Sequence, residues 1–145
     1  MTSFYDALET RAPKDREAAL MAALPAQIAN AQKNSKAFAD ILAGVDAASV
    51  TSREALAKLP VTRKYQLLER QQAQRSTNPF GGFATHGFGP AMPRVFASPG
   101  PIYEPEGQRK DYWRMARAIY AAHSIAGHGG EDFSSVIKML QKKQA

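Results

Sequence analysis

Apolar residues recur at helical spacing through the first quarter of the chain. Four of them would share one face of a helix: Leu20, Leu24, Ile28 and Ala31. The pattern predicts a helix over 14–34. It begins at Lys14 or Asp15, with Pro13 just outside it. Pro25 lies inside the pattern, so either a second helix begins there or one long helix is kinked.

Shorter apolar groups follow and predict short helices. Phe38, Ile41 and Leu42 predict a helix over 37–43 that Gly44 ends. Residues 45–50 then form a linker.

The next two helices are predicted over 52–58 and 63–73. Either Thr51 or Ser52 caps the first of them, and Thr51 with Glu54 has the spacing of a capping box. Thr62 is predicted to cap the second, whose apolar contacts are Leu67 and Leu68.

From Gln71 to Pro93 the chain is rich in Gly, Pro, Ser and Thr, which favours loop. Phe80, Phe83 and Phe88 stand among the glycines. Such aromatic side chains either stack on a planar ligand or fix an irregular loop to a core.

The last third of the chain is predicted to form a strand, a loop and then helix. A short apolar run predicts one or two strands around 94–98, and an irregular loop is expected over 99–107. Residues 108–124 form the most amphipathic predicted helix, and a small tail helix is expected over 131–143.

The helix over 108–124 has two contrasting sides, at about 100° per residue. One arc is apolar, apart from a histidine at its edge: Tyr112, Met115, Ala116, Ile119 and His123. The other side is basic: Arg109, Lys110, Arg114 and Arg117. Either the apolar arc packs on a core and the basic side faces water, or the basic side binds an anionic partner.

Composition limits the function classes. The chain has 145 residues, a net charge of +6 and no cysteine, which excludes disulfides and zinc–thiolate sites. A basic balance favours anionic partners, but there is no long Lys/Arg run, and nucleic acid is an unlikely partner. No apolar stretch predicts a membrane helix and no signal peptide is recognisable, so a cytoplasmic location is expected.

Three phrases follow one another along the chain. Residues 52–68 contain an LxxLPxTxK phrase at Leu56, Leu59, Pro60, Thr62 and Lys64, followed by Leu68. Residues 79–83 read Pro-Phe-Gly-Gly-Phe, and residues 97–105 include Ala97, Ser98, Gly100 and Pro105. These phrases resemble, in turn, the LxxLPxTxKxDL phrase, the PFG turn and the phosphate loop of the phenylacetate-CoA ligase family of adenylate-forming enzymes, with Gln66 in place of the usual Asp. The long helical segment that ends at Ala37-Phe38 resembles the family's N-terminal segment. Order and spacing therefore match over about 5–126, whereas 127–145 does not resemble the family.

The resemblance implies a fold and a chemistry. The fold is expected to be mainly α: the helical N-terminal region of an adenylate-forming enzyme with one or two short strands, truncated before the nucleotide-binding core. The family uses ATP, Mg²⁺ and CoA to convert a carboxylate into an acyl-CoA. On this chain the resemblance implies cofactor contacts at Ser98, Gly100 and Gly107, with no catalytic residue and no metal site.

The phosphate loop departs from the family pattern. Pro101 and Ile102 replace two threonines, Tyr103 replaces a glycine, and Glu104 replaces the lysine. The chain alone is therefore expected to be inactive and to bind no cofactor tightly. Alternative functions are a non-catalytic helical module that self-associates or packs on a missing domain, and a basic module that binds polyanions.

Overall fold

A computed structural model describes residues 4–109, 114–122, 138 and 141–142. This part of the chain is mainly helical with one small antiparallel sheet, as predicted. It divides into two compact units, one formed by residues 14–108 and the other by 1–13 with 109–145. The expected boundary at 126/127 falls outside the described residues.

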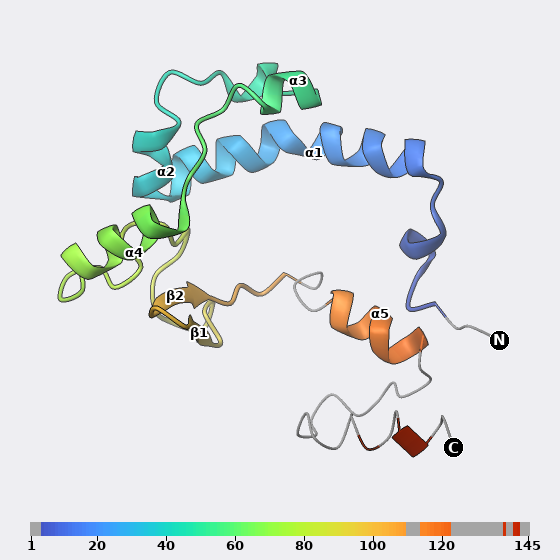
Figure 1. Ribbon diagram of the computed structural model, residues 1–145. Helices are drawn as coiled ribbons and strands as arrows, with labels where there is room; N and C mark the ends of the chain where they lie inside the picture. The colour runs from blue at the N-terminus through green and yellow to red at the C-terminus, as the bar shows by residue number, and fades with distance from the viewer. Residues whose placement is uncertain (1–3, 110–113, 123–137, 139–140, 143–145) are drawn as a thin grey trace. The chain divides into compact units, whose positions relative to one another are not determined.

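The larger unit contains most of the regular structure (Figure 1). Its elements in chain order are α1 (Pro13–Asn34), α2 (Lys36–Ile41), the 3-10 turn η2 (Ala47–Ser49), α3 (Arg53–Leu56), α4 (Lys64–Ala73), β1 (Val95–Ser98) and β2 (Ile102–Pro105). The long predicted helix is confirmed, and it continues through Pro25 as one helix.

The main core lies where α1, α2 and the segment after them meet. Ile28, Leu42 and Val50 are buried together, with Leu24 and Leu59 among the partly buried residues around them. The prediction that 45–50 is only a linker is wrong, because Val50 completes this core.

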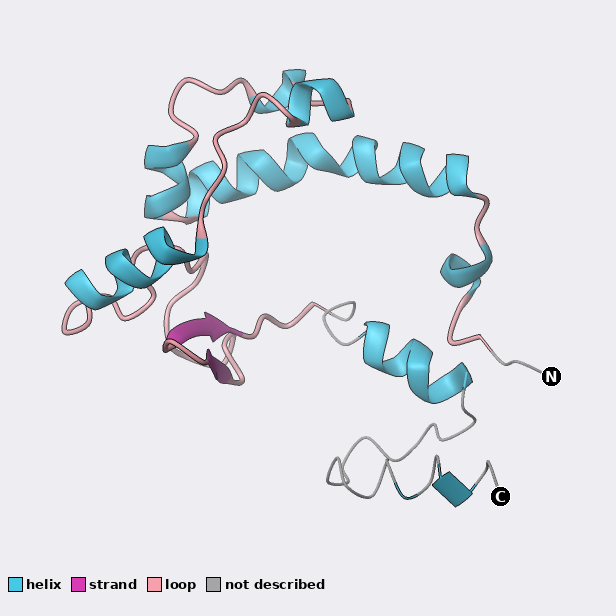
Figure 2. Ribbon diagram, in the orientation of Figure 1, coloured by secondary structure: helices cyan, strands magenta, loops and turns pink. Residues whose placement is uncertain are grey.

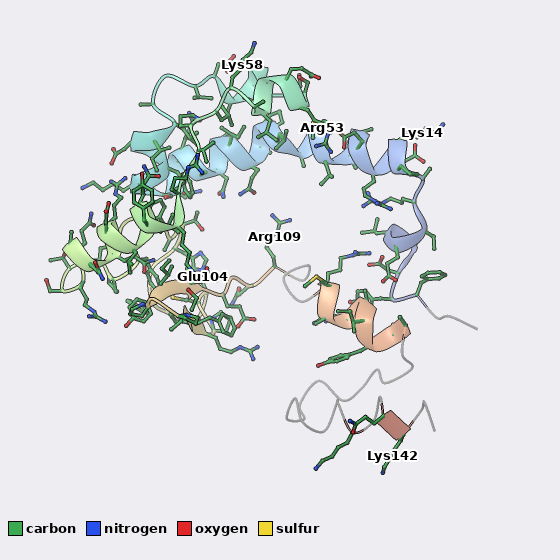
Figure 3. All side chains as sticks on the ribbon, in the orientation of Figure 1. Lys14, Arg53, Lys58, Glu104, Arg109 and Lys142 are labelled. Carbon is green, nitrogen blue, oxygen red and sulfur yellow. The ribbon has the colours of Figure 1, made fainter. Side chains whose placement is uncertain are left out.

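Of the two caps predicted for α3, Thr51 or Ser52, the structure shows Ser52, whose hydroxyl accepts a hydrogen bond from the Ala55 N–H at 3.2 Å. The cap position of α4 is Arg63 rather than Thr62, and the Gln66 side chain accepts the Arg63 N–H at 2.7 Å. Arg53 of α3, labelled in Figure 3, donates to Glu17 of α1 at 2.7 Å.

The Gly81-Gly82 turn lies against both α2 and α4. The Gly82 carbonyl accepts hydrogen bonds from the Ser35 hydroxyl at 2.9 Å and from the Ala37 N–H at 3.0 Å. Gly81 has φ +61°, and a Cβ there would lie 2.9 Å from the backbone of Arg70. Glycine is therefore required for this turn to lie directly on α4.

The strands β1 and β2 form an antiparallel hairpin (Figure 2), and α4 packs on β2. The predicted strand around 94–98 is confirmed. The prediction of an irregular loop over 99–107 is wrong for Ile102–Pro105, which pairs with β1.

The smaller unit contains the 3-10 turn η1 (Ala7–Thr10) and helix α5 (Arg114–Ala122). The prediction that this helix begins at Gln108 is wrong, because residues 108 and 109 are not helical. Tyr112, Lys110 and His123 lie outside the described residues. Within the predicted tail helix, the described residues 138 and 141–142 are helical.

The contacts of α5 do not fit the interpretation in which the apolar arc packs on a core and the basic side faces water. Met115 and Ile119 of the apolar arc are 77% and 48% exposed. On the basic side, Arg114 binds the Asp6 carboxylate and Arg117 donates to the Tyr5 hydroxyl at 3.1 Å. Arg114 and Arg117 thus hold the N-terminal segment. Throughout the described part of the chain, every helix is too short or too polar to span a bilayer.

Candidate functional site

The hairpin contains two of the predicted cofactor-binding residues near one end and the third beyond the other. Ser98 ends β1 and pairs with Ile102, while Gly100 lies in the connecting turn with φ +116°. Gly107 follows β2 at the opposite end. A four-residue strand is about 13 Å long. The structure therefore brings Ser98 and Gly100 together but does not bring Gly107 to them.

The turn itself offers few donors to an anion. It consists of Pro99, Gly100 and Pro101, and proline has no backbone N–H. Gly100 alone supplies a backbone donor within these three residues. A phosphate cradle needs several N–H groups that converge on one point.

A buried glutamine of α4 closes the outer side of β2. Gln71 is 4% exposed. Its side chain donates to the Tyr103 carbonyl at 2.9 Å and accepts the Tyr103 N–H at 2.8 Å. The amide thereby takes the place of a neighbouring strand. Sequence reasoning missed this role, although Gln71 follows Leu67 and Leu68 on the apolar stripe of the same helix.

Charged side chains surround the hairpin. Arg75 donates to the Tyr103 hydroxyl at 3.0 Å, and its guanidinium lies 6.0 Å from that ring. Glu104 is exposed on β2 (Figure 3). Glu106 is buried and accepts a hydrogen bond from Arg94 at 2.6 Å. The positive charge of Arg94 is thus offset within the hairpin.

The glycine-rich segment contributes an open pocket of about 400 Å³. Its walls include the side chains of Asn34, Asn78, Phe80, His86 and Phe88. Phe80 is buried, whereas Phe88 is 71% exposed, and their ring centroids are 5.3 Å apart.

His86 was not assigned a role from the sequence. Its Nδ1 lies 3.2 Å from the Thr85 hydroxyl, and its Nε2 is buried without a hydrogen-bond partner in the described structure. A Cβ at Gly107 would lie 3.7 Å from the His86 ring. Because Nε2 is covered, this nitrogen cannot act on a molecule in the pocket as the structure stands.

Phe83 fixes the same segment to the helices. Its ring makes an edge contact with Phe38 of α2 at 5.3 Å between centroids, and the Arg70 guanidinium lies 5.7 Å from its centroid. Phe80 and Phe83 therefore fit the interpretation in which aromatic side chains fix a loop to a core. Of the three, Phe88 is the most exposed.

A second pocket, of about 390 Å³, is mostly apolar. It lies over α1 and α2 and is lined by much of the Leu-Pro phrase, including Leu56, Leu59, Pro60 and Val61. Val61 is 69% exposed at its rim. Gln27 and Thr62 are the polar residues of its lining, and the rest is apolar, so the pocket is suited to apolar groups.

Metal-binding chemistry finds no support among the described residues, since no three His, Asp or Glu side chains there lie close enough to share an ion. Comparisons of the chain with protein families, with curated proteins and with solved structures found no match.

The contact between Asp6 and Arg114 has a measurable electrostatic consequence. The hydrogen bond from Arg114 lowers the pKa of Asp6, and the Leu8 N–H adds to this effect against partial desolvation. A lowered folded-state pKa means that the contact stabilises the fold above the ordinary aspartate pKa. This contribution is lost as the pH falls through the folded-state pKa.

We expect Arg114→Gln to raise the pKa of Asp6 toward its ordinary value. Carboxyl chemical shifts followed by NMR through an acid titration measure this directly. Arg117→Gln is the matched control, because Arg117 contacts Tyr5 rather than Asp6. Equal Asp6 titration curves in the wild type and Arg114→Gln would show that the two side chains are not paired in solution.

Proposed function

We propose that this chain is the N-terminal helical region of an AMP-forming acyl-CoA ligase of the phenylacetate-CoA ligase kind, acting in the cytoplasm and inactive by itself. The observation that carries the proposal is the order of three family-like phrases along residues 52–105. Each of them lies at a defined structural element: the rim of the apolar pocket, the Gly81-Gly82 turn and the β1–β2 hairpin.

The packing of these phrases supports a scaffolding role. The Leu-Pro phrase forms one wall of the apolar pocket, and the Gly81-Gly82 turn lies against the backbone of α4. Both phrases are therefore placed by packing against the helices. We expect a helical scaffolding region of such an enzyme to contain these packed phrases, while the catalytic groups of the family lie in another part of the enzyme.

Reconstitution tests the proposal. The purified chain is mixed with a phenylacetate-CoA ligase from which the corresponding N-terminal region has been deleted. CoA thioester formation from ATP and phenylacetate is then measured. We expect no product from the chain alone and more product from the mixture than from the deleted enzyme. Product from the chain alone, or no gain on mixing, would contradict the proposal.

The altered phosphate loop gives a separate prediction about nucleotide binding. We expect no tight binding of ATP, because the turn has one N–H donor and Glu104 adds negative charge on the strand that follows it. Calorimetric titration with Mg²⁺ and ATP measures the affinity. Micromolar binding that Gly100→Val abolishes would mean that the hairpin turn still acts as a phosphate cradle.

A helical interaction module is the second candidate. It is favoured by the exposure of Met115 and Ile119, which share one face of α5. Scattered apolar residues are ordinary on a surface, but two on one helix face fit association with a partner or with a second copy. The polyanion-binding alternative is less favoured, because Arg114 already binds an internal carboxylate.

A further inference from the structure

The two edges of the hairpin differ in their free backbone groups. On the outer edge of β2, both backbone groups of Tyr103 are bound by Gln71. Pro105, the next residue on that side, has no N–H to offer. The outer edge of β2 is therefore closed to a further strand.

The outer edge of β1 is open. Glu106 donates its N–H to the Arg94 carbonyl at 2.8 Å, so residues 94 and 106 form a hydrogen-bonded pair. Hydrogen-bonded and non-hydrogen-bonded pairs alternate along an antiparallel ladder. Val95 and Ala97 therefore direct their N–H and C=O groups away from β2. Over the described residues, these four groups have no partner.

The open edge is short and bounded. Pro93 stands two residues before Val95, and Pro99 stands two residues after Ala97. Neither proline can donate a hydrogen bond. The open edge therefore offers two N–H donors and two C=O acceptors, which belong to Val95 and Ala97 on either side of Phe96. We call these four groups the window.

Between these two prolines, the window at Val95 and Ala97 has no charged side chain to block pairing. Natural edges are commonly blocked by charged residues, proline or bulges. Val95, Phe96 and Ala97 carry no charge, and Val95 is 42% exposed.

We propose that β1 pairs antiparallel with β1 of a second copy of this chain, with Phe96 opposite Phe96 of the second copy. In this register Val95 exchanges both hydrogen bonds with Ala97 of the second copy, and Ala97 does so with Val95 of the second copy. All four groups on each edge are satisfied. Shifting this register by two residues in one direction would place Pro99 of the second copy opposite Val95, and in the other direction Pro93 opposite Ala97. The C=O group of Val95 or Ala97 would then have no N–H donor.

The register also places side chains favourably. Phe96 and its counterpart form a non-hydrogen-bonded pair, in which side chains approach most closely and aromatic pairs are stabilising. The charge of Arg94 is offset by Glu106 in each copy. The pairing is thus self-complementary in backbone, side chain and charge, which is the argument for a second copy. It does not depend on the proposed ligase relationship.

Ala97→Pro tests the pairing. It removes one outward N–H from each copy, and the hairpin already accepts proline at the outward position 105 of β2. Sedimentation equilibrium over a range of concentrations measures association. We expect the wild type to dimerise reversibly and Ala97→Pro to weaken the dimer by roughly tenfold or more. Protection of the Glu106 amide, which bonds to the Arg94 carbonyl across the hairpin, confirms that the variant keeps its hairpin. A wild type that stays monomeric, or a dimer that Ala97→Pro leaves unchanged, would overturn the proposal.

Charge pairing tests the register. One double variant combines Val95→Lys with Ala97→Lys, and the other combines Val95→Glu with Ala97→Glu. Because residue 95 faces residue 97 of the second copy, each double variant alone places like charges opposite each other and should dimerise less than the wild type. Their equimolar mixture should form a heterodimer. Double variants that self-associate as strongly as the wild type, or a mixture that does not associate, would contradict this register.

Discussion

Gly81→Ala is expected to destabilise the larger unit by about 2–4 kcal/mol. Two effects add at this position. A residue with a Cβ is strained at φ +61°, and that Cβ would lie 2.9 Å from the Arg70 carbonyl carbon and the Gln71 nitrogen. These are backbone atoms of α4, which cannot turn aside as the end of a flexible side chain can. Either the turn or the helix has to move.

Urea unfolding followed by circular dichroism measures the loss, as a lower midpoint at an unchanged slope. Gly87→Ala is the matched control. A Cβ at Gly87 meets nothing within 4 Å, so that change should alter stability by no more than about 0.5 kcal/mol. Similar midpoints for the two variants would mean that the turn does not lie on α4 as described.

The same turn shows what sequence patterns can predict. The helical spacing of apolar residues gave α1 and its end at Asn34, because burial of one helix face requires that spacing. The glycines marked a turn. Nothing in the local sequence revealed that Gly82 would accept hydrogen bonds from Ser35 and Ala37, since these residues are far away along the chain.

The missed strand β2 has a related cause. Prolines at 101 and 105 indicate a loop when they are read locally. In the hairpin, however, Pro105 occupies a position whose N–H would point away from β1, so no ladder hydrogen bond is lost. A rule based on composition cannot tell an outward position from an inward one until the register is known.

The periodicity of apolar residues also could not predict which side of α5 would make contacts. Within α5 the pattern separates Met115 and Ile119 from Arg114 and Arg117, but it could not say which pair would contact other residues. That depended on Asp6 and Tyr5, more than 100 residues earlier. Of the predicted cofactor contacts, Gly107 lies apart from Ser98 and Gly100 for a similar reason, because the pairing of β2 carries it to the other end of the hairpin.

Gln71→Ala is expected to destabilise the larger unit by about 2–3 kcal/mol. The change removes one buried side chain that satisfies two backbone groups, the N–H and the C=O of Tyr103. Both groups would then lack a protein partner, and the contact that joins α4 to the hairpin through this amide would be lost. Gln71→Met keeps most of the side-chain volume, so it should recover any part of the loss that is due to packing and none of the part that is due to hydrogen bonding.

Two measurements separate this role from general destabilisation. Urea unfolding gives the total effect, with Gln72→Ala as the matched control, since Gln72 is an exposed glutamine on the same helix. Amide exchange gives the local effect, because the Tyr103 N–H should lose more protection in Gln71→Ala than amides in the core around Ile28 and Leu42. If Gln71→Ala unfolds at the same midpoint as Gln72→Ala and the Tyr103 amide stays protected, then α4 does not close the edge of β2. The hairpin would in that case have two open edges rather than one.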